Sequence, residues 1–96
     1  MKEHITIIGA GNLTMSILGA IKRSGAKFKI NVVDIDKKKS PQLKKFGVGF
    51  NTTYDDRISK SEFILLIVKP KDYVQAIKSI NSYVDSQTII LSFIAG

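Results

Sequence analysis

Two glycines lie where an apolar run typical of a β-strand passes directly into a run typical of a helix. The stretch is ITIIGAGNLTMSILGAI, residues 5–21, and the glycines are Gly9 and Gly11. Glycine weakens either element by roughly 0.5–1 kcal/mol relative to alanine, so the pair indicates a turn too tight for a side chain or a ligand that approaches the backbone. In dinucleotide-binding folds the first glycine forms the turn and the second admits the pyrophosphate. The spacing therefore favours a phosphate cradle over a purely structural turn.

Two further positions bear on this interpretation. Thr14 stands where a third glycine is usual, and it fits if the helix stands slightly off the sheet or if Gly19 supplies the close contact one turn later. Asp34 follows the turn by roughly 25 residues, where such folds place a carboxylate that accepts hydrogen bonds from the adenosine ribose. The alternative for Asp34 is a turn or capping residue, although Asp36 is the better capping candidate.

A second pair of residues, Lys69 and Pro70, follows another apolar run. Proline holds the preceding residue in an extended conformation and is favoured at the first position of a helix, so Lys69 should end a strand. This pair either lines the nicotinamide side of a cofactor or only separates strand from helix. His4, the one histidine, precedes the first strand, and we expect it to lie at the surface rather than to act in catalysis. We expect no metal site and identify no catalytic residue.

The elements that must position these residues alternate along the chain. Apolar, β-branched runs predict strands at 4–9, 28–34, 48–51, 62–68 and 87–94. Helical spacing and end signals predict helices at 12–24, 41–46 and 70–84, with one or two turns at 53–60. The runs at 62–68 and 87–94 are almost continuously apolar, as in parallel strands that are covered on both faces.

This alternation predicts an α/β fold, a Rossmann-like doubly wound parallel sheet of five strands with helices on both faces. The expected strand order is 3-2-1-4-5, which places a switch point between strands 1 and 4. Ligands of such sheets bind beyond the carboxyl ends of the strands at that point. We therefore expect the GAGN turn and the VKP segment to lie next to each other there.

Composition limits the remaining possibilities. Residues 1–96 suffice for one domain, and the absence of cysteine is compatible with a cytoplasmic protein. The net charge is +7, yet the lysines are dispersed and no aromatic residues alternate with them, so a solvated basic surface is favoured over nucleic-acid binding. No apolar run approaches the roughly 20 residues of a membrane span, and we expect no membrane partner.

Three segments, IIGAGNL, FILLIVKPKDY and IILSFIAG, together resemble the N-terminal half of pyrroline-5-carboxylate reductase. That family has an IGxGNM-type turn, a VKP after the fourth strand and an S-x-x-AG segment after the fifth. The chain is similar, less closely, to deazaflavin-dependent NADP reductases and β-hydroxyacid dehydrogenases. The resemblance implies NAD(P)H-dependent reduction of the imine 1-pyrroline-5-carboxylate to proline. It also implies a helical C-terminal domain after Gly96 that supplies dimerisation and most of the substrate site.

The resemblance also assigns cofactor contacts by position. The pyrophosphate would contact Gly9, Ala10, Gly11, Asn12 and Leu13, the adenosine ribose Asp34, and the nicotinamide side Val68, Lys69, Pro70, Ala95 and Gly96. The sequence departs from the family at Thr14, at Ile35, where an arginine is frequent, and at Tyr54, where an asparagine is frequent. A domain that senses a dinucleotide without catalysis remains the alternative function, although it has no need of the VKP and S-x-x-AG segments.

Overall fold

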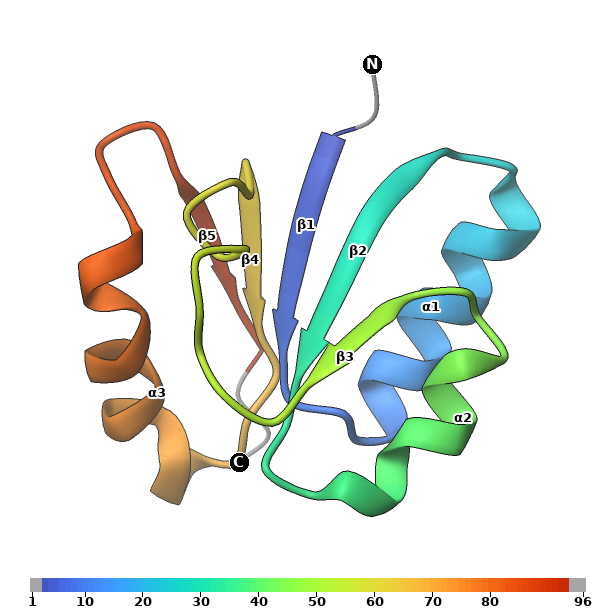
Figure 1. Cartoon of the computed structure of the whole chain (residues 1–96), viewed down its shortest axis with the longest axis horizontal. Coiled ribbons are helices and arrows are strands. Elements are labelled where there is room, and N and C mark those ends of the chain that lie inside the picture. The colour runs from blue at the N-terminus through green and yellow to red at the C-terminus, as the bar shows by residue number, and fades with distance from the viewer. Residues whose placement is uncertain (1–2, 94–96) are drawn as a thin grey trace.

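Five parallel strands form a single sheet in the order β3-β2-β1-β4-β5 (Figure 1). The structure is a computed structural model that describes residues 3–93. Its strands are β1 (Glu3–Ile8), β2 (Phe28–Val33), β3 (Gly49–Asn51), β4 (Phe63–Leu66) and β5 (Ile89–Ser92). Its helices are α1 (Asn12–Ser24), η1 (Lys37–Lys39), α2 (Ser40–Lys44), η2 (Pro70–Asp72), α3 (Tyr73–Ile80) and η3 (Asn81–Tyr83). The sequence-based strand order is therefore confirmed.

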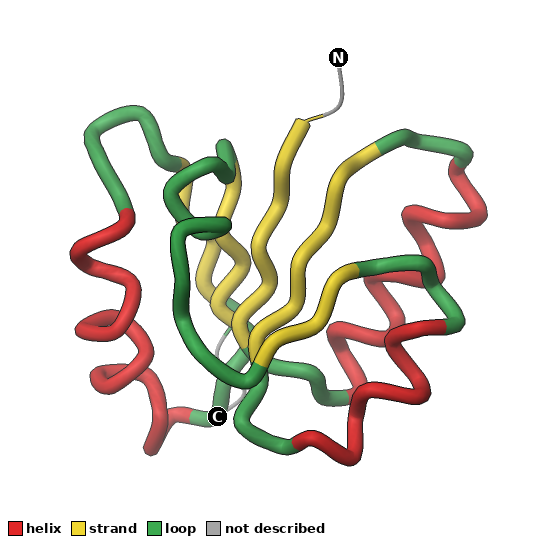
Figure 2. Tube along the Cα trace, in the orientation of Figure 1, coloured by secondary structure: helices red, strands yellow, loops and turns green. Residues whose placement is uncertain are grey.

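Two apolar cores cover the two faces of the sheet, because successive side chains of a strand point to opposite faces. On one face, Ile5 and Ile7 of β1 pack with α1 and α2 through Leu18 and Leu43. On the other face, Ile8 packs with α3 and with the segment between β3 and β4. Figure 2 shows α1 and α2 on one side of the strands and α3 on the other. Helices thus cover both faces, as expected of a doubly wound sheet.

The turns predicted within 53–60 are present at residues 56–60, for example with a hydrogen bond from the Ile58 N–H to the carbonyl of Asp55. The structure differs from the sequence-based prediction in the burial of the last strand. Strand β5 is apolar but exposed along its whole length, so the expectation that it is covered on both faces is wrong for the described residues. An apolar run shows that a strand can be buried, but only its neighbours decide whether it is. No helix within residues 3–93 has both the length and the apolar character to cross a membrane.

Candidate functional site

The turn after β1 requires glycine at its first position. Gly9 has a φ of 108°, which L side chains rarely adopt, and its N–H donates to the carbonyl of Val33 on β2 at 2.8 Å. A Cβ on Gly9 would lie 2.0 Å from the carbonyl oxygen of Ile67, just after β4. The chain therefore passes between the carboxyl ends of β2 and β4 with no space for a side chain. The GAGN turn and the segment after β4 lie next to each other, as the sequence predicted.

Gly11 is different, because nothing in residues 3–93 requires a glycine there. Its φ of −85° and ψ of −167° are open to any residue, and a Cβ would meet no atom within 4 Å. Gly11 is also the N-cap of α1, and no side chain caps that helix. Backbone N–H groups at an uncapped helix N-terminus attract anions. Open space beside these groups is what a phosphate cradle requires, and the exposed Asn12 and Leu13 border it.

Thr14 occupies the usual third glycine position without separating the helix from the turn. It is fully buried, and its hydroxyl donates to the carbonyl of Gly9 at 2.6 Å. Gly19 is not the substitute contact, because a Cβ there would meet Arg23 and Phe46 rather than the sheet. The threonine therefore fastens the start of α1 to the glycine turn by a hydrogen bond.

Asp34, immediately after β2, ties the glycine turn to the neighbouring loop. Its Oδ2 accepts from the N–H of Ala10 at 2.7 Å, and its Oδ1 accepts from the N–H of Asp36 at 2.8 Å. Asp36 in turn accepts from the N–H of Lys38 and caps η1, as the sequence indicated. Asp34 is thus a turn residue, but each of its oxygens retains a second lone pair. Its carboxylate is held in one orientation and can still accept further hydrogen bonds.

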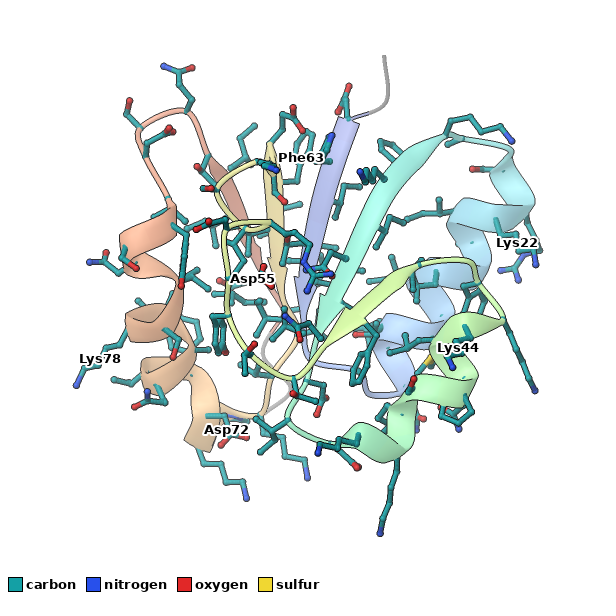
Figure 3. The ribbon with its side chains drawn as sticks, in the orientation of Figure 1. Lys22, Lys44, Asp55, Phe63, Asp72 and Lys78 are labelled. Carbon is teal, nitrogen blue, oxygen red and sulfur yellow. The ribbon has the colours of Figure 1, made fainter. Side chains whose placement is uncertain are left out.

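A cavity of about 360 Å³ opens beside Asp34 and the glycine turn. Strand ends supply part of its lining: Ile8, Gly9, Val33, Asp34, Ile35 and Val68. The remaining lining comes from the segment after β3 and from the helical region after β4: Tyr54, Asp72, Gln75, Ala76 and Ser79. Figure 3 labels Asp72 at the carboxyl-end side of the sheet. The apolar walls and few polar groups are typical of a small-molecule site.

Four polar residues of this cavity were not predicted as site residues. Asp72, Gln75 and Ser79 have the spacing of one helical face, and this polar stripe was the available signal. Tyr54 stood out only as a departure from the resembled family. Burial raises the pKa of the Tyr54 phenol, a hydrogen bond with Ser79 opposes this, and the Asp34 and Asp72 carboxylates raise it further. Tyr54 is therefore a neutral hydroxyl at physiological pH.

In the segment after β4, Lys69 and Pro70 have the predicted conformations, although β4 ends at Leu66 and not, as predicted, next to Lys69. Lys69 is extended, with φ of −71° and ψ of 153°, and Pro70 begins η2 directly after it. Val68 lines the cavity, whereas Lys69 and Pro70 are exposed beside it. Ala95 and Gly96, the remaining predicted contacts, lie outside the described residues. The other predicted contacts gather at the carboxyl ends of β1, β2 and β4.

Comparison with protein families gives one match over nearly the whole chain. Residues 4–96 match the family model described as NADP oxidoreductase, coenzyme F420-dependent. No curated protein sequence matches the chain.

Solved structures with the same fold include three relevant kinds of enzyme. A pyrroline-5-carboxylate reductase from Coxiella burnetii aligns with a TM-score of 0.89 at 21% identity, over 100% of this chain and 37% of that one. Prephenate dehydrogenase from A. aeolicus, in complex with NAD+, gives 0.85 at 18% identity, over 98% and 34%. An imine reductase from Myxococcus stipitatus, in complex with NADP+, gives 0.70 at 23% identity, over 97% and 32%. The chain thus spans about a third of the length of these proteins.

Proposed function

We propose that this chain is the cofactor half of an enzyme that reduces the cyclic imine 1-pyrroline-5-carboxylate to proline. The chain belongs to the family of coenzyme F420-dependent NADP oxidoreductases, and it is an NAD(P)-binding domain of that oxidoreductase class. The observation that carries the cofactor-binding part of the proposal is the contrast between Gly9, which the fold requires, and Gly11, which the described residues do not require to be glycine. A glycine without a structural reason beside an uncapped helix is accounted for by a ligand that contacts the backbone.

We propose that a dinucleotide lies along the described part of the site. The N-terminus of α1 would hold the pyrophosphate over Gly11, since it is uncapped and faces open space. The cavity beside Asp34 would hold the adenosine, with the free lone pairs of the carboxylate accepting from the ribose hydroxyls. Val68, Lys69 and Pro70 would border the nicotinamide side. When bound, a reduced nicotinamide supplies the hydride.

The substrate assignment is supported by the VKP and S-x-x-AG segments of the sequence and by the family likeness, not by a substrate pocket. Hydride transfer requires the imine carbon to be held against the cofactor in a reactive geometry. We propose that the groups that hold it come from polypeptide other than these 96 residues. The chain alone should accordingly bind a dinucleotide weakly and reduce no imine at a useful rate.

A second candidate function is hydride exchange between NADP and a deazaflavin, and the description of the matched family favours it. Both candidates use the same cofactor half and differ in the partner that gains or loses the hydride. Expression of the entire reading frame that encodes the chain allows the two to be compared directly. Conversion of 1-pyrroline-5-carboxylate to proline with consumption of NADH or NADPH supports the first. Exchange with a deazaflavin and no proline formation contradicts the first and supports the second.

A further inference from the structure

The cavity beside Asp34 has a polar wall that the proposed contacts with the pyrophosphate and the ribose leave unused. Asp72 at the end of η2 and Gln75 and Ser79 on α3 contribute to this wall, and Tyr54 joins it from the segment after β3. Among the described residues that line the cavity, none is a lysine or an arginine. The positions of the protons on the hydroxyl and amide groups therefore decide what the wall can bind.

The hydroxyl protons of Ser79 and Tyr54 are both used within the protein. Ser79 Oγ donates its one proton to the backbone carbonyl of Gln75 at 2.9 Å. In the hydrogen bond between Ser79 and Tyr54, the serine therefore accepts and the phenol donates. Neither hydroxyl has a proton left to donate to a ligand.

The same serine fixes the orientation of the Gln75 side-chain amide. Gln75 Nε2 lies 3.4 Å from Ser79 Oγ, and since that oxygen has no proton to give, the group that faces it is the NH2. The carbonyl oxygen Oε1 of Gln75 then has no hydrogen-bond partner within residues 3–93. Gln75 thus offers a free acceptor beside the one donor that remains on this wall, the second proton of Nε2.

Asp72 adds a charged acceptor. Its side chain does not cap α3, and within the described part of the chain it forms no ion pair. It is exposed and lines the cavity, so a ligand can reach it. A carboxylate only accepts hydrogen bonds. The wall formed by Asp72 and Gln75 is therefore rich in acceptors and calls for a ligand that donates.

The part of a dinucleotide that would reach this wall is its base. With the ribose at Asp34, the base is the next group, and the apolar lining from Ile35 and Ala76 suits its flat faces. Adenine carries an amino donor at its 6-position, beside the acceptor N1. Hypoxanthine carries a 6-oxo acceptor, as guanine does, beside an N–H. A 6-oxo group would face the Asp72 carboxylate with no proton between the two oxygens.

We propose that Asp72 and Gln75 determine which base the chain accepts, and that they select a 6-amino purine over a 6-oxo purine. This inference rests on the proposed function, because it takes the ribose to lie at Asp34. The amino group donates to the Asp72 carboxylate or to Gln75 Oε1, and a 6-oxo group leaves both without a donor. Loss of one such hydrogen bond corresponds to a roughly fivefold or greater difference in affinity.

The test is a fluorescence titration of the chain with NADH and with reduced nicotinamide hypoxanthine dinucleotide, which differs only in the base. We expect the hypoxanthine form to bind at least roughly fivefold more weakly. In Asp72→Asn, the side-chain amide can donate to the 6-oxo group, so most of this difference should disappear. Asparagine is as good an N-cap as aspartate, so the start of α3 is retained.

The matched control is Asp56→Asn, which makes the same change of charge at an exposed residue outside the cavity lining. It should leave the ratio of the two affinities unchanged, and Gln75→Glu, which keeps an acceptor, should preserve the preference for adenine. Equal affinities in the wild type, or an unchanged ratio in Asp72→Asn, would overturn the inference and leave cofactor binding intact. Failure of both dinucleotides to bind saturably would overturn the proposed function together with this inference.

Discussion

Gly9 and Gly11 are two residues apart and make opposite predictions when replaced. In Gly9→Ala, the alanine backbone must keep the positive φ of 108°, which costs an L residue about 1–2 kcal/mol. Its Cβ would also lie 2.0 Å from the Ile67 carbonyl oxygen. Moving that carbonyl strains the adjoining hydrogen bond from the Ile67 N–H to the Ile8 carbonyl, worth about 1–3 kcal/mol if lost. The free energy of unfolding should therefore fall by about 3 kcal/mol or more.

In Gly11→Val, the corresponding terms nearly cancel. An apolar N-cap costs about 0.5–1 kcal/mol relative to glycine, whereas replacing glycine at a compatible φ and ψ gains about 0.4–1 kcal/mol by restricting the unfolded chain. The valine would, however, occupy the space proposed for the pyrophosphate. We expect unfolding within about 1 kcal/mol of the wild type and no dinucleotide binding.

Thermal unfolding and a fluorescence titration with NADH measure both effects. For a domain of this size 1 kcal/mol moves Tm by about 4–8 °C, so Gly9→Ala should lower Tm by about 12 °C or more and Gly11→Val by a few degrees at most. Gly11→Ala serves as the control, with a smaller side chain and a smaller loss of affinity. Full NADH affinity in folded Gly11→Val would refute the reasoning, because the open space would then have no role in binding.

Three further predictions concern Asp34, Thr14 and Asp55. NADH should bind at least as well as NADPH, because the Asp34 carboxylate repels a 2′-phosphate and the exposed Ile35 offers no guanidinium. Asp34→Ser with Ile35→Arg should shift the preference toward NADPH. A clear preference of the wild type for NADPH, in a titration with both cofactors, would contradict this. Thr14→Val should lower the free energy of unfolding by about 1–3 kcal/mol, because the Gly9 carbonyl loses its buried donor, whereas Thr14→Ser should stay close to the wild type in denaturant unfolding. The Arg57 guanidinium holds the pKa of the Asp55 carboxyl below its ordinary value of 3.8. This pair therefore stabilises the fold above pH 3.8, and its contribution is lost as the pH falls through the lower pKa of the folded state. Asp55→Asn should make the free energy of unfolding depend less on pH in this range, and an unchanged pH dependence would count against the pair.

Local patterns in the sequence were enough to predict the strand order and the place of the site. Alternating apolar runs determine a parallel sheet, and Gly9 and Pro70 mark the two turns that meet at its carboxyl ends. The hydrogen bond between Ala10 and Asp34 could not be predicted, since it depends on how closely two loops approach after the sheet forms. The same holds for Tyr54, which reaches the cavity only because the segment after β3 folds back across the sheet.

The sequence also did not predict the burial of Asn31 or the exposure of strand β5. Asn31 lies within an apolar strand, and its side-chain amide is buried with no hydrogen-bond partner among the described residues. Strand β5 has the composition of an interior strand, yet in residues 3–93 it is the last strand of the sheet and remains exposed. The apolar composition of a strand is compatible with burial, but the neighbouring elements determine whether the strand is buried.

The central claim is that the dinucleotide lies along the glycine turn and in the cavity beside Asp34. A titration of the isotope-labelled chain with NADH, followed by NMR, tests it at each residue. We predict saturable shifts at Gly9 to Leu13, at Asp34 and at Val68, and none at the amino ends of the strands around Lys29. Saturable shifts confined to the amino ends, or no saturable shift at Gly11 and Asp34, would contradict the account.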